Sequence, residues 1–243
     1  MRGANVGDNG TKVLKKVIVI SRSDASELEK LLVKNGFKIA EKDPDFIVCY
    51  GGDGTVLFAE RKFPQVAKLI VKRSSICREC DYTFNEIGSV LRKLRNQEFK
   101  IKKEMKLEAK FKKTRLIGLN EIQVHNKLPS SAIRFSVVVD GEEFDDLIGD
   151  GIVVATPFGS TGYHRSTGGK QFQKGIGISF NNLHNKKIKS FVTSEESTVT
   201  TRITRGPAWI IADNNENYVE LMDHDVCTIR KSKSTADFIY VPK

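Results

Sequence analysis

The sequence predicts two domains, an N-terminal α/β domain of the doubly wound, Rossmann-like type and a C-terminal all-β sandwich. Two continuous apolar runs, 17–20 and 46–50, flank a segment of helical periodicity, which is typical of strands buried on both faces of a parallel sheet. From Phe99 onward, alternating apolar and polar residues indicate half-buried strands instead. We therefore expect an α/β domain over 13–97 and a β-rich domain over 98–243, whose extreme C-terminus can return to the first domain.

Each element of the α/β domain follows from apolar spacing and from stop signals. Leucines recur at helical spacing between 28 and 32, and Asn35-Gly36 is a typical helix end. Glycines 51, 52 and 54 end the second strand and lead into another helix. The expected elements are strand 17–20, a helix that ends at Asn35, strand 46–50, helix 55–62, strand 68–72 and a helix near 84–96.

The β-rich domain is expected to consist of short strands. Three valines followed by Asp140-Gly141 are a typical hairpin signal. An apolar run that ends at Ala155 indicates a buried strand. The expected strands are 106–111, 121–125, 134–139, 152–155, 199–203, 209–211 and 226–230.

The chain is basic, with 40 Lys and Arg against 30 Asp and Glu and a net charge of +10. Such a surface attracts polyanions, among them nucleotides, polyphosphate and nucleic acid, although dispersed, solvated lysines explain the charge equally well. The sequence shows no zinc-finger spacing, RNP aromatic pattern or heptad run, so a nucleic-acid partner is not expected. It also lacks an apolar stretch long enough to span a membrane and a signal peptide. We therefore expect a cytoplasmic protein without a membrane partner.

The four cysteines fit a reduced, intracellular protein. Cys77 and Cys80 form a C-x-x-C, but no second pair completes a four-thiolate zinc site. We interpret them as two reduced thiols near a loop, with a metal shared between two chains as the alternative. Cys49 and Cys227 each fall in an apolar strand, where a buried thiol is expected.

The Y-G-G-D-G-T motif at Tyr50–Thr55 carries the strongest chemical signal, because a buried strand runs through a glycine-rich turn into a helix. Such a turn presents backbone N–H groups and the positive end of the helix to an anion. Asp53 distinguishes it from a plain phosphate loop, since phosphates repel a carboxylate unless it binds a metal or accepts a proton. This arrangement suits phosphoryl transfer to a hydroxyl. The structural alternative is a tight turn that uses glycine for its positive φ.

Two further motifs suit a nucleoside. Asp150–Tyr163 reads D-G-I-V-V-A-T-P-F-G-S-T-G-Y, and its small hydroxyls can bind base edges or phosphates while Tyr163 offers a stacking face. Asn120-Glu121 begins an alternating strand, and an ionised Glu121 is an acceptor suited to paired ribose hydroxyls. The alternatives are a Ser/Thr-capped turn with a packed tyrosine and a solvated strand edge.

Taken in order, GGDGT at 51–55, NE at 120–121 and DG…TPFGSTGY at 150–163 resemble the NAD kinase family, whose pattern is GGDGT, NE or ND, and DG…TPTGSTAY. The resemblance extends from about Val17 to Ile229. It implies an α/β domain and a β-sandwich domain with a dinucleotide bound between them. It also implies that ATP or inorganic polyphosphate, with Mg²⁺ or another divalent cation, phosphorylates the 2′-hydroxyl of the adenosine ribose of NAD. A homodimer or homotetramer is implied as well.

The resemblance assigns a role to each matching residue. Asp53 is the base that activates the 2′-hydroxyl, with Gly52, Gly54 and Thr55 beside it at the substrate. Asp150 contacts the nicotinamide end of the substrate or the ligand of a neighbouring subunit. Asn120 and Glu121 hold the other nucleoside half, and the adenine pocket is lined by Ser160, Thr161, Gly162 and Tyr163 and closed by Ser166.

The chain departs from the family pattern in three places. Segment 73–82 reads R-S-S-I-C-R-E-C-D-Y where the family has a glycine-rich N-x-G-x-L-G-F. Phe158 and Gly162 replace threonine and alanine, and His164-Arg165 replaces Ser-Leu, which points to a reshaped or more basic adenine pocket.

Two other functions stay open from the sequence. A lipid kinase of the diacylglycerol or sphingosine type shares the GGDGT loop and the two-domain plan, but the G-S-T-G-Y turn favours a nucleoside acceptor. A non-catalytic nucleotide-binding regulator would keep the pocket without transfer. Asp53 argues against such a regulator, since a carboxylate repels phosphates and would not help a protein that only binds a nucleotide.

Overall fold

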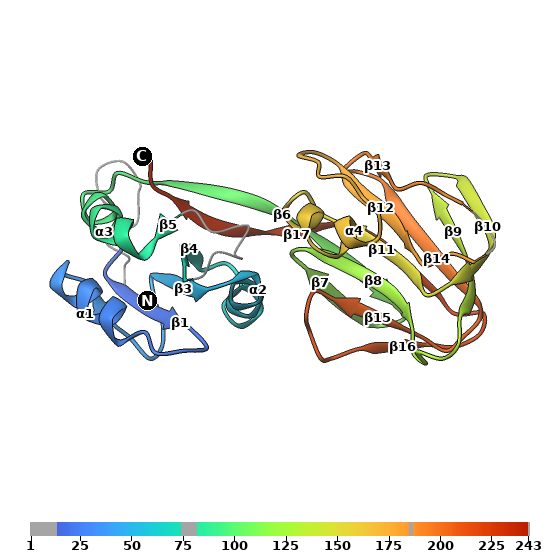
Figure 1. Ribbon diagram of the computed structural model, residues 1–243, viewed down its shortest axis with the longest axis horizontal. Helices are drawn as coiled ribbons and strands as arrows, with labels where there is room; N and C mark the ends of the chain where they lie inside the picture. Colours follow the sequence, from blue (N-terminus) through green and yellow to red (C-terminus); the bar gives the residue numbers. More distant parts are fainter. Residues whose placement is uncertain (1–13, 74–81, 185–186, 243) are drawn as a thin grey trace. The chain divides into compact units, whose positions relative to one another are not determined.

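The computed structural model describes residues 14–73, 82–184 and 187–242 (Figure 1). The Cys77-x-x-Cys80 pair and most of the divergent segment that begins at Arg73 lie outside these residues. Among the described residues, no helix is both long and apolar enough to cross a membrane.

Residue contacts divide the chain into two units. Unit 1 runs to Glu104 and includes the chain again from Ala236, and unit 2 comprises Met105–Thr235. Two long strands, β6 (Lys100–Phe111) and β17 (Val226–Tyr240), contribute residues to both units.

The sheet of unit 1 is parallel. β1 pairs with β2 and β3, and β4 pairs with β3, with β5 and, through Lys68 and Phe238, with β17. The apolar runs of β3 and β4 place these strands inside the sheet, where both faces are covered. The strands are β1 Lys16–Ile20, β2 Lys38–Ile39, β3 Phe46–Gly51, β4 Ala67–Lys72 and β5 Tyr82–Thr83.

Helices cover both faces of this sheet, because successive side chains of a strand point to opposite sides. Val48 and Val71 pack in one core cluster with α1 and α3. On the opposite face, Lys68 pairs with Glu60 of α2, and burial raises the pKa of the Cys49 thiol to about 12. The predicted doubly wound α/β domain is therefore confirmed. The helices are α1 Ser26–Lys34, α2 Asp53–Lys62, the 3₁₀ turn η1 Phe84–Glu86 and α3 Ile87–Arg95.

Unit 2 is a sandwich of two antiparallel sheets, as predicted. One sheet has the order β10-β9-β14-β17, with β6 pairing with β17 and β7, and the other has the order β13-β12-β11-β8-β15-β16. Apolar side chains of both sheets, such as Phe135 and Val154, form one core. The elements are β7 Thr114–Gly118, β8 Glu121–Asn126, β9 Ile133–Val139, β10 Glu142–Gly149, β11 Gly151–Ala155, η2 Phe158–Thr161, α4 Tyr163–Ser166, β12 Ile176–Asn181, β13 Phe191–Thr193, β14 Thr198–Arg205, β15 Ala208–Ala212 and β16 Val219–Leu221.

The predicted hairpin between β9 and β10 is confirmed. Val139 pairs with Glu142, and the turn residues Asp140 and Gly141 both have positive φ, at 50° and 94°. Two consecutive residues of positive φ match the right-handed twist of the strands that they join. Cys227 is buried in β17, as expected.

Several elements begin or end differently from the sequence prediction, and three of them show what the sequence pattern could not specify. β6 begins at Lys100 rather than at 106, β17 continues to Tyr240 rather than ending at 230, and α2 begins at Asp53 rather than at 55. The extensions of both strands are rich in charged and hydroxyl side chains, so no apolar alternation marks them. Pairing between β6 and β17 supplies the backbone hydrogen bonds instead.

Candidate active site

The Y-G-G-D-G-T motif forms the junction of β3 and α2 in unit 1. Gly52 caps the helix in an extended conformation (φ −111°, ψ −171°), and Asp53 is the first helical residue. The Thr55 N–H donates to the Gly52 carbonyl at 2.9 Å. A Cβ on Gly51 would lie 2.3 Å from Thr55 Oγ1, whereas a Cβ on Gly52 would meet none of the described residues within 4 Å, its chain neighbours aside. Gly51 is therefore needed for packing within the turn, and Gly52 leaves open space beside it.

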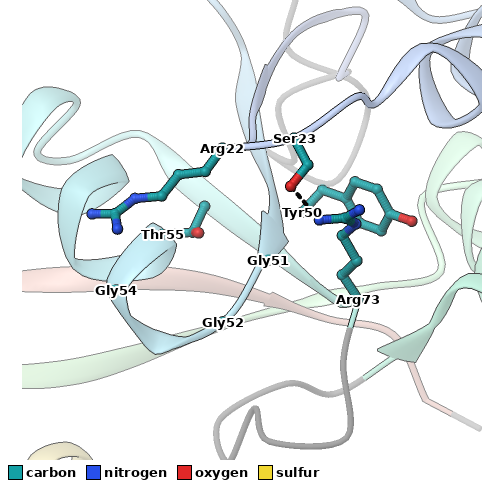
Figure 2. Close-up of a pocket in the computed structure, with 8 residues that line it drawn as sticks. All are labelled: Arg22, Ser23, Tyr50, Gly51, Gly52, Gly54, Thr55 and Arg73. Atoms are coloured by element: carbon teal, nitrogen blue, oxygen red, sulfur yellow. Dashed lines mark hydrogen bonds between the residues drawn. The ribbon is translucent and has the colours of Figure 1, made fainter.

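A cleft of about 540 Å³ opens at this turn (Figure 2). Its walls come from the carboxyl ends of three strands of the parallel sheet, which is the usual place for a ligand in an open α/β sheet. Asp53 is half-buried and lies in sequence between two glycines that line the cleft. The lining residues are Arg22 and Ser23 after β1, Tyr50, Gly51 and Gly52 at the end of β3, Gly54 and Thr55 in α2, and Arg73 after β4.

The two arginines of this cleft, Arg22 and Arg73, lie outside the motifs that the sequence pattern marks. In the view of Figure 2, Arg22 and Arg73 lie on either side of the glycine turn, and the Arg73 guanidinium donates to Ser23 Oγ. A basic residue shortly after each of two parallel strands was the available signal, because the carboxyl ends of such strands meet at one edge of the sheet.

In unit 2, Asp213 holds the backbone of the Asn120-Glu121 pair. The Asp213 carboxylate accepts hydrogen bonds from the N–H groups of Leu119 at 2.8 Å, Asn120 at 2.7 Å and Glu121 at 3.1 Å. The Asp213 N–H donates to the Glu121 carbonyl at 3.0 Å. Charge-assisted hydrogen bonds are roughly twice as strong as neutral ones. Asp213 therefore sets the direction in which both side chains leave the backbone.

The second glycine-rich turn packs directly against this pair. The Thr156 N–H donates to the Asn120 carbonyl at 2.8 Å. A Cβ on Gly159 would lie 2.1 Å from the same carbonyl oxygen, and a Cβ on Gly162 would lie 3.4 Å from Glu121 Oε2. The structure thus brings Asn120, Glu121 and the G-S-T-G turn into contact. We refer to this cluster of residues, together with Tyr163, as the pocket of unit 2.

Two buried polar atoms of this pocket, Asn120 Oδ1 and Glu121 Oε2, have no hydrogen-bond partner among the described residues. Burial raises the pKa of the Glu121 carboxyl to about 8, with a further contribution from the Asp213 charge, against hydrogen bonds from Gln123 and the Tyr163 N–H. Without a ligand, the Glu121 carboxyl is therefore largely protonated at pH 7. The sequence alone leads us to expect an ionised carboxylate. Unpaired buried polar atoms are costly, so the pair is suited to a polar ligand, and hydroxyl donors would favour the ionised form.

The other residues of the turn differ in what they offer a ligand. Tyr163 begins α4 and is 48% exposed, so its ring is accessible to a stacking partner. Ser166 is exposed, and its hydroxyl donates to the Tyr163 carbonyl at 2.8 Å. The Ser160 hydroxyl is fully buried and donates to the Pro157 carbonyl at 2.7 Å, which commits it to the turn. Thr161 is half-buried.

Asp150 lies apart from the other predicted site residues of unit 2. It precedes β11, whereas the turn follows that strand, and Ala155 at the far end of β11 pairs with Glu121. Five residues of extended chain place Asp150 about 17 Å from that end. Asn182 Nδ2 donates to the Asp150 carboxylate at 3.1 Å. The structure therefore does not bring Asp150 together with Glu121.

His164 is buried behind the turn rather than facing outward from it. Its side chain is almost inaccessible, with Nδ1 3.1 Å from Ser179 Oγ, and its ring packs edge-on against Phe172. Burial lowers the pKa of this histidine below its ordinary value, which favours the neutral imidazole. The expectation of a more basic pocket therefore applies only to Arg165, which is exposed.

The cleft and the pocket together define a class of protein. A glycine-rich turn with two arginines at the edge of a parallel sheet suits linked phosphates. A buried polar pocket beside an accessible tyrosine suits a nucleoside. A chain that carries both is a phosphotransferase that acts on a nucleotide.

Comparison with known proteins identifies the family. Residues 119–241 match the ATP-NAD kinase C-terminal domain. The NAD kinase of Thermoplasma volcanium is 32% identical over 223 residues, which cover 88% of this chain and 80% of that protein. The NAD kinase of Thermoplasma acidophilum is 29% identical over 221 residues with the same coverage. The chain belongs to the NAD kinase family and is a phosphotransferase with NAD kinase activity.

Two solved structures share the fold. An NAD kinase from Archaeoglobus fulgidus in complex with ATP matches with a TM-score of 0.82 at 24% identity, over 94% of each chain. A yeast NADH kinase complexed with NADH matches with a TM-score of 0.81 at 17% identity, over 95% of this chain and 84% of the other. These likenesses agree with the α/β domain and β sandwich described above.

Proposed function

We propose that this chain phosphorylates the 2′-hydroxyl of the adenosine ribose of NAD, with ATP or inorganic polyphosphate as the donor. The observation that carries the proposal is the pocket in which Asn120 Oδ1 and Glu121 Oε2 are buried without partners among the described residues. Ribose hydroxyls and a base amino group supply the donors that these oxygens need, and the accessible ring of Tyr163 supplies a stacking face for the base.

Asp53 is the proposed general base. A bond forms between the 2′-oxygen of the ribose and the terminal phosphorus of the donor, and the bond from that phosphorus to its bridging oxygen breaks. The electron pair of the broken bond leaves with the remaining donor phosphates, and the proton of the hydroxyl passes to the Asp53 carboxylate. Assistance of this kind contributes about 10²–10⁴-fold to the rate. The open space at Gly52 supports the approach of a phosphate to the backbone beside Asp53.

The proposed divalent cation, Mg²⁺ for example, binds together with the donor. Among the described residues, no three or more His, Cys, Asp and Glu side chains cluster in a way that could hold a metal alone. Mg²⁺ at phosphoryl-transfer sites is held by one or two carboxylates and by substrate phosphates. The donor phosphates in the cleft would therefore supply most of the ligands of the cation, and Asp53 stays available as the base. When bound, the cation neutralises charge on the donor phosphates.

We also propose a cytoplasmic homodimer or homotetramer in which Asp150 serves a ligand other than the nucleoside held by Glu121. The support is the family resemblance and the separation of Asp150 from Glu121 along β11. Light scattering on the purified chain tests the assembly, and a monomer at micromolar concentration would contradict it.

A comparison of acceptors tests the proposed reaction. The purified chain is incubated with Mg²⁺, with ATP or polyphosphate, and with NAD⁺, diacylglycerol or sphingosine. We expect NADP⁺ and no lipid phosphate. A lipid product without NADP⁺ would assign a lipid kinase, and NAD⁺ binding without turnover would assign a regulator.

A further inference from the structure

We infer that Arg22 and Arg73 bind the phosphate chain of the phosphoryl donor. The inference rests on the proposed function and extends it, because neither arginine belongs to the three sequence motifs. Arg73 also begins the segment in which the chain departs from the family pattern. The ligand chemistry is a run of linked phosphates, which ATP and inorganic polyphosphate share.

The positions of the two arginines follow from the parallel sheet. Arg22 lies two residues after the end of β1, and Arg73 follows the last residue of β4. β3 lies between these two strands and delivers the glycine turn. All three strands run in one direction, so their carboxyl ends meet at a single edge, and the cleft of about 540 Å³ lies there. Figure 2 shows the turn with one arginine on either side.

The charge of the cleft is positive. Arg22 is exposed and makes no hydrogen bond or ion pair through its side chain within the part of the chain that the structure describes. Arg73 donates to the hydroxyl of Ser23, which is neutral, so its positive charge is retained. None of the described residues that line the cleft is acidic. Guanidinium groups bind phosphate through two parallel hydrogen bonds, which makes arginine well suited to linked phosphates.

The carboxylate of Asp24 interacts with Arg73: the pKa of Asp24 is lowered mainly by hydrogen bonds from Ser26, with smaller contributions from Lys30 and Arg73. Its carboxylate accepts from the Ser26 N–H at 2.9 Å and from the Ser26 hydroxyl at 3.0 Å. Asp24 is thus committed to the start of α1, and it is fully exposed to water, which screens its attraction for Arg73.

The open space at Gly52 is a second observation that points to a ligand. Its two chain neighbours aside, a Cβ there would meet no atom of the residues that the structure describes within 4 Å, and the backbone conformation is one that alanine adopts. Gly52→Ala should therefore fold as the parent does. A methyl group in the same space would obstruct a phosphate that lies against the turn.

A purely structural role for Arg73 predicts a different effect of its substitution on phosphate binding. If Arg73 only joins the end of β4 to the loop after β1 through Ser23, its removal lowers stability and leaves phosphate binding intact. Ser23→Ala breaks the same hydrogen bond without removing charge. A role in phosphate binding predicts that Arg73→Gln weakens the ligand far more than Ser23→Ala does.

Titration calorimetry on the full chain provides the test, with inorganic tripolyphosphate and ATP as separate probes. Arg22→Gln and Arg73→Gln should each weaken both ligands about tenfold or more, since hydrogen bonds to charged groups contribute roughly 1.5–3 kcal/mol. Arg92→Gln on α3 is the matched control, because it removes the same charge from an exposed site in unit 1 that does not line the cleft. Weaker tripolyphosphate binding alone also supports the inference, with polyphosphate as the source of the phosphates.

Unchanged affinity for both ligands in the two variants would overturn the inference, and so would a loss confined to ATP, which would place the arginines against the nucleoside. Equal losses in the Arg92→Gln control would overturn it too, since net charge alone would then explain the effect. Melting temperatures show whether each variant is folded, and Arg73→Lys replaces Arg73→Gln if the latter unfolds.

Steady-state kinetics separates this inference from the proposed function. The two arginine variants should raise the KM for the donor and leave the KM for NAD⁺ unchanged. If the parent forms NADP⁺ and the arginine variants keep its donor affinity, the inference fails and the function stands. If the parent forms no NADP⁺, the function fails, and the tripolyphosphate titration still decides the role of the arginines.

Discussion

The cleft of unit 1 and the pocket of unit 2 offer a ligand opposite physical environments. The cleft is open and lined by a glycine-rich backbone and two arginines, and its shape comes from one six-residue motif with the neighbouring strand ends. The pocket is buried, and its oxygens are held by contacts among segments around Glu121, Gly159 and Asp213. A multiply charged phosphate chain tolerates an exposed, loosely shaped site, because charge acts over a distance. A nucleoside has no such charge and requires fixed donors and acceptors.

The two regions should therefore fail differently when they are altered. Changes at the cleft are expected to affect turnover or donor affinity while the protein stays folded. Changes to the buried residues of the pocket should affect stability and NAD binding together, because the proposed ligand contacts and the packing involve the same atoms.

The largest expected effect is on turnover, from Asp53→Asn in unit 1. The substitution keeps size and polarity but cannot accept the proton, so turnover should fall about 10²–10⁴-fold. It also removes a negative charge beside the cleft, so donor affinity should hold or rise. Single-turnover formation of NADP⁺ and calorimetric binding of ATP measure the two quantities.

Two results would alter this assignment. Near-normal turnover in Asp53→Asn would transfer the role of base to Glu121 or to a metal-bound hydroxide. Loss of nucleotide binding together with activity would indicate a structural or metal-anchoring carboxylate. Arg92 does not line the cleft, so Arg92→Gln serves as the control and should keep the turnover and ATP affinity of the parent.

The second largest expected effect is the pH dependence of the free energy of unfolding that Glu121 of unit 2 causes. Its pKa is raised from 4.5 to about 8 in the folded chain, so the folded state holds a proton that the unfolded state releases. The stability that this proton provides is complete below about pH 4.5 and is lost as the pH rises through 8. The loss should reach several kcal/mol, since each unit of pKa difference is worth about 1.4 kcal/mol.

Urea unfolding between pH 5 and pH 8.5, without ligand, tests this dependence. Glu121→Gln cannot ionise, so it should be more stable than the parent at pH 8.5 and show a flatter profile. Parallel profiles for the parent and Glu121→Gln would show that this carboxyl does not titrate in that range. Asp53→Asn should leave the difference between pH 5 and pH 8.5 in place, which distinguishes the pocket from the cleft.

The sequence predicted the local parts of both regions and missed the long-range ones. The strand-turn-helix of GGDGT and the hairpin at Asp140-Gly141 are local, because glycine placement and apolar spacing specify them directly. Arg22 and Arg73 are brought to one cleft by the pairing of strands that lie far apart along the chain, and no short motif contains both residues. The sequence also did not predict in which direction side chains point. Ser160 and His164 lie in or directly after the G-S-T-G-Y motif, which resembles a binding motif, yet both side chains face inward.

A pair of glycine substitutions tests how tightly the pocket is built. Gly159→Ala places a Cβ 2.1 Å from the Asn120 carbonyl oxygen, so backbone must move, and NAD⁺ affinity should fall tenfold or more. Gly162→Ala is the matched control, since its Cβ would lie no closer than 3.2 Å, to the Gly159 carbonyl oxygen, and it should bind NAD⁺ within about threefold of the parent. Equal effects of the two substitutions, measured by calorimetry and melting temperature, would show that the pocket adapts and is not rigid.

The smallest expected effect comes from Tyr163→Ala, at the one exposed residue of the pocket for which we propose stacking on the base. Stacking is worth on the order of 1 kcal/mol beyond area burial, so NAD⁺ affinity should fall several-fold. Because the ring is 48% exposed, its removal leaves no cavity in the core, and the melting temperature should stay near that of the parent. Tyr163→Phe keeps the stacking face and should bind NAD⁺ as the parent does. If Tyr163→Ala binds NAD⁺ unchanged, the base lies elsewhere, whereas a large fall in melting temperature would make Tyr163 part of the packing that unit 2 requires.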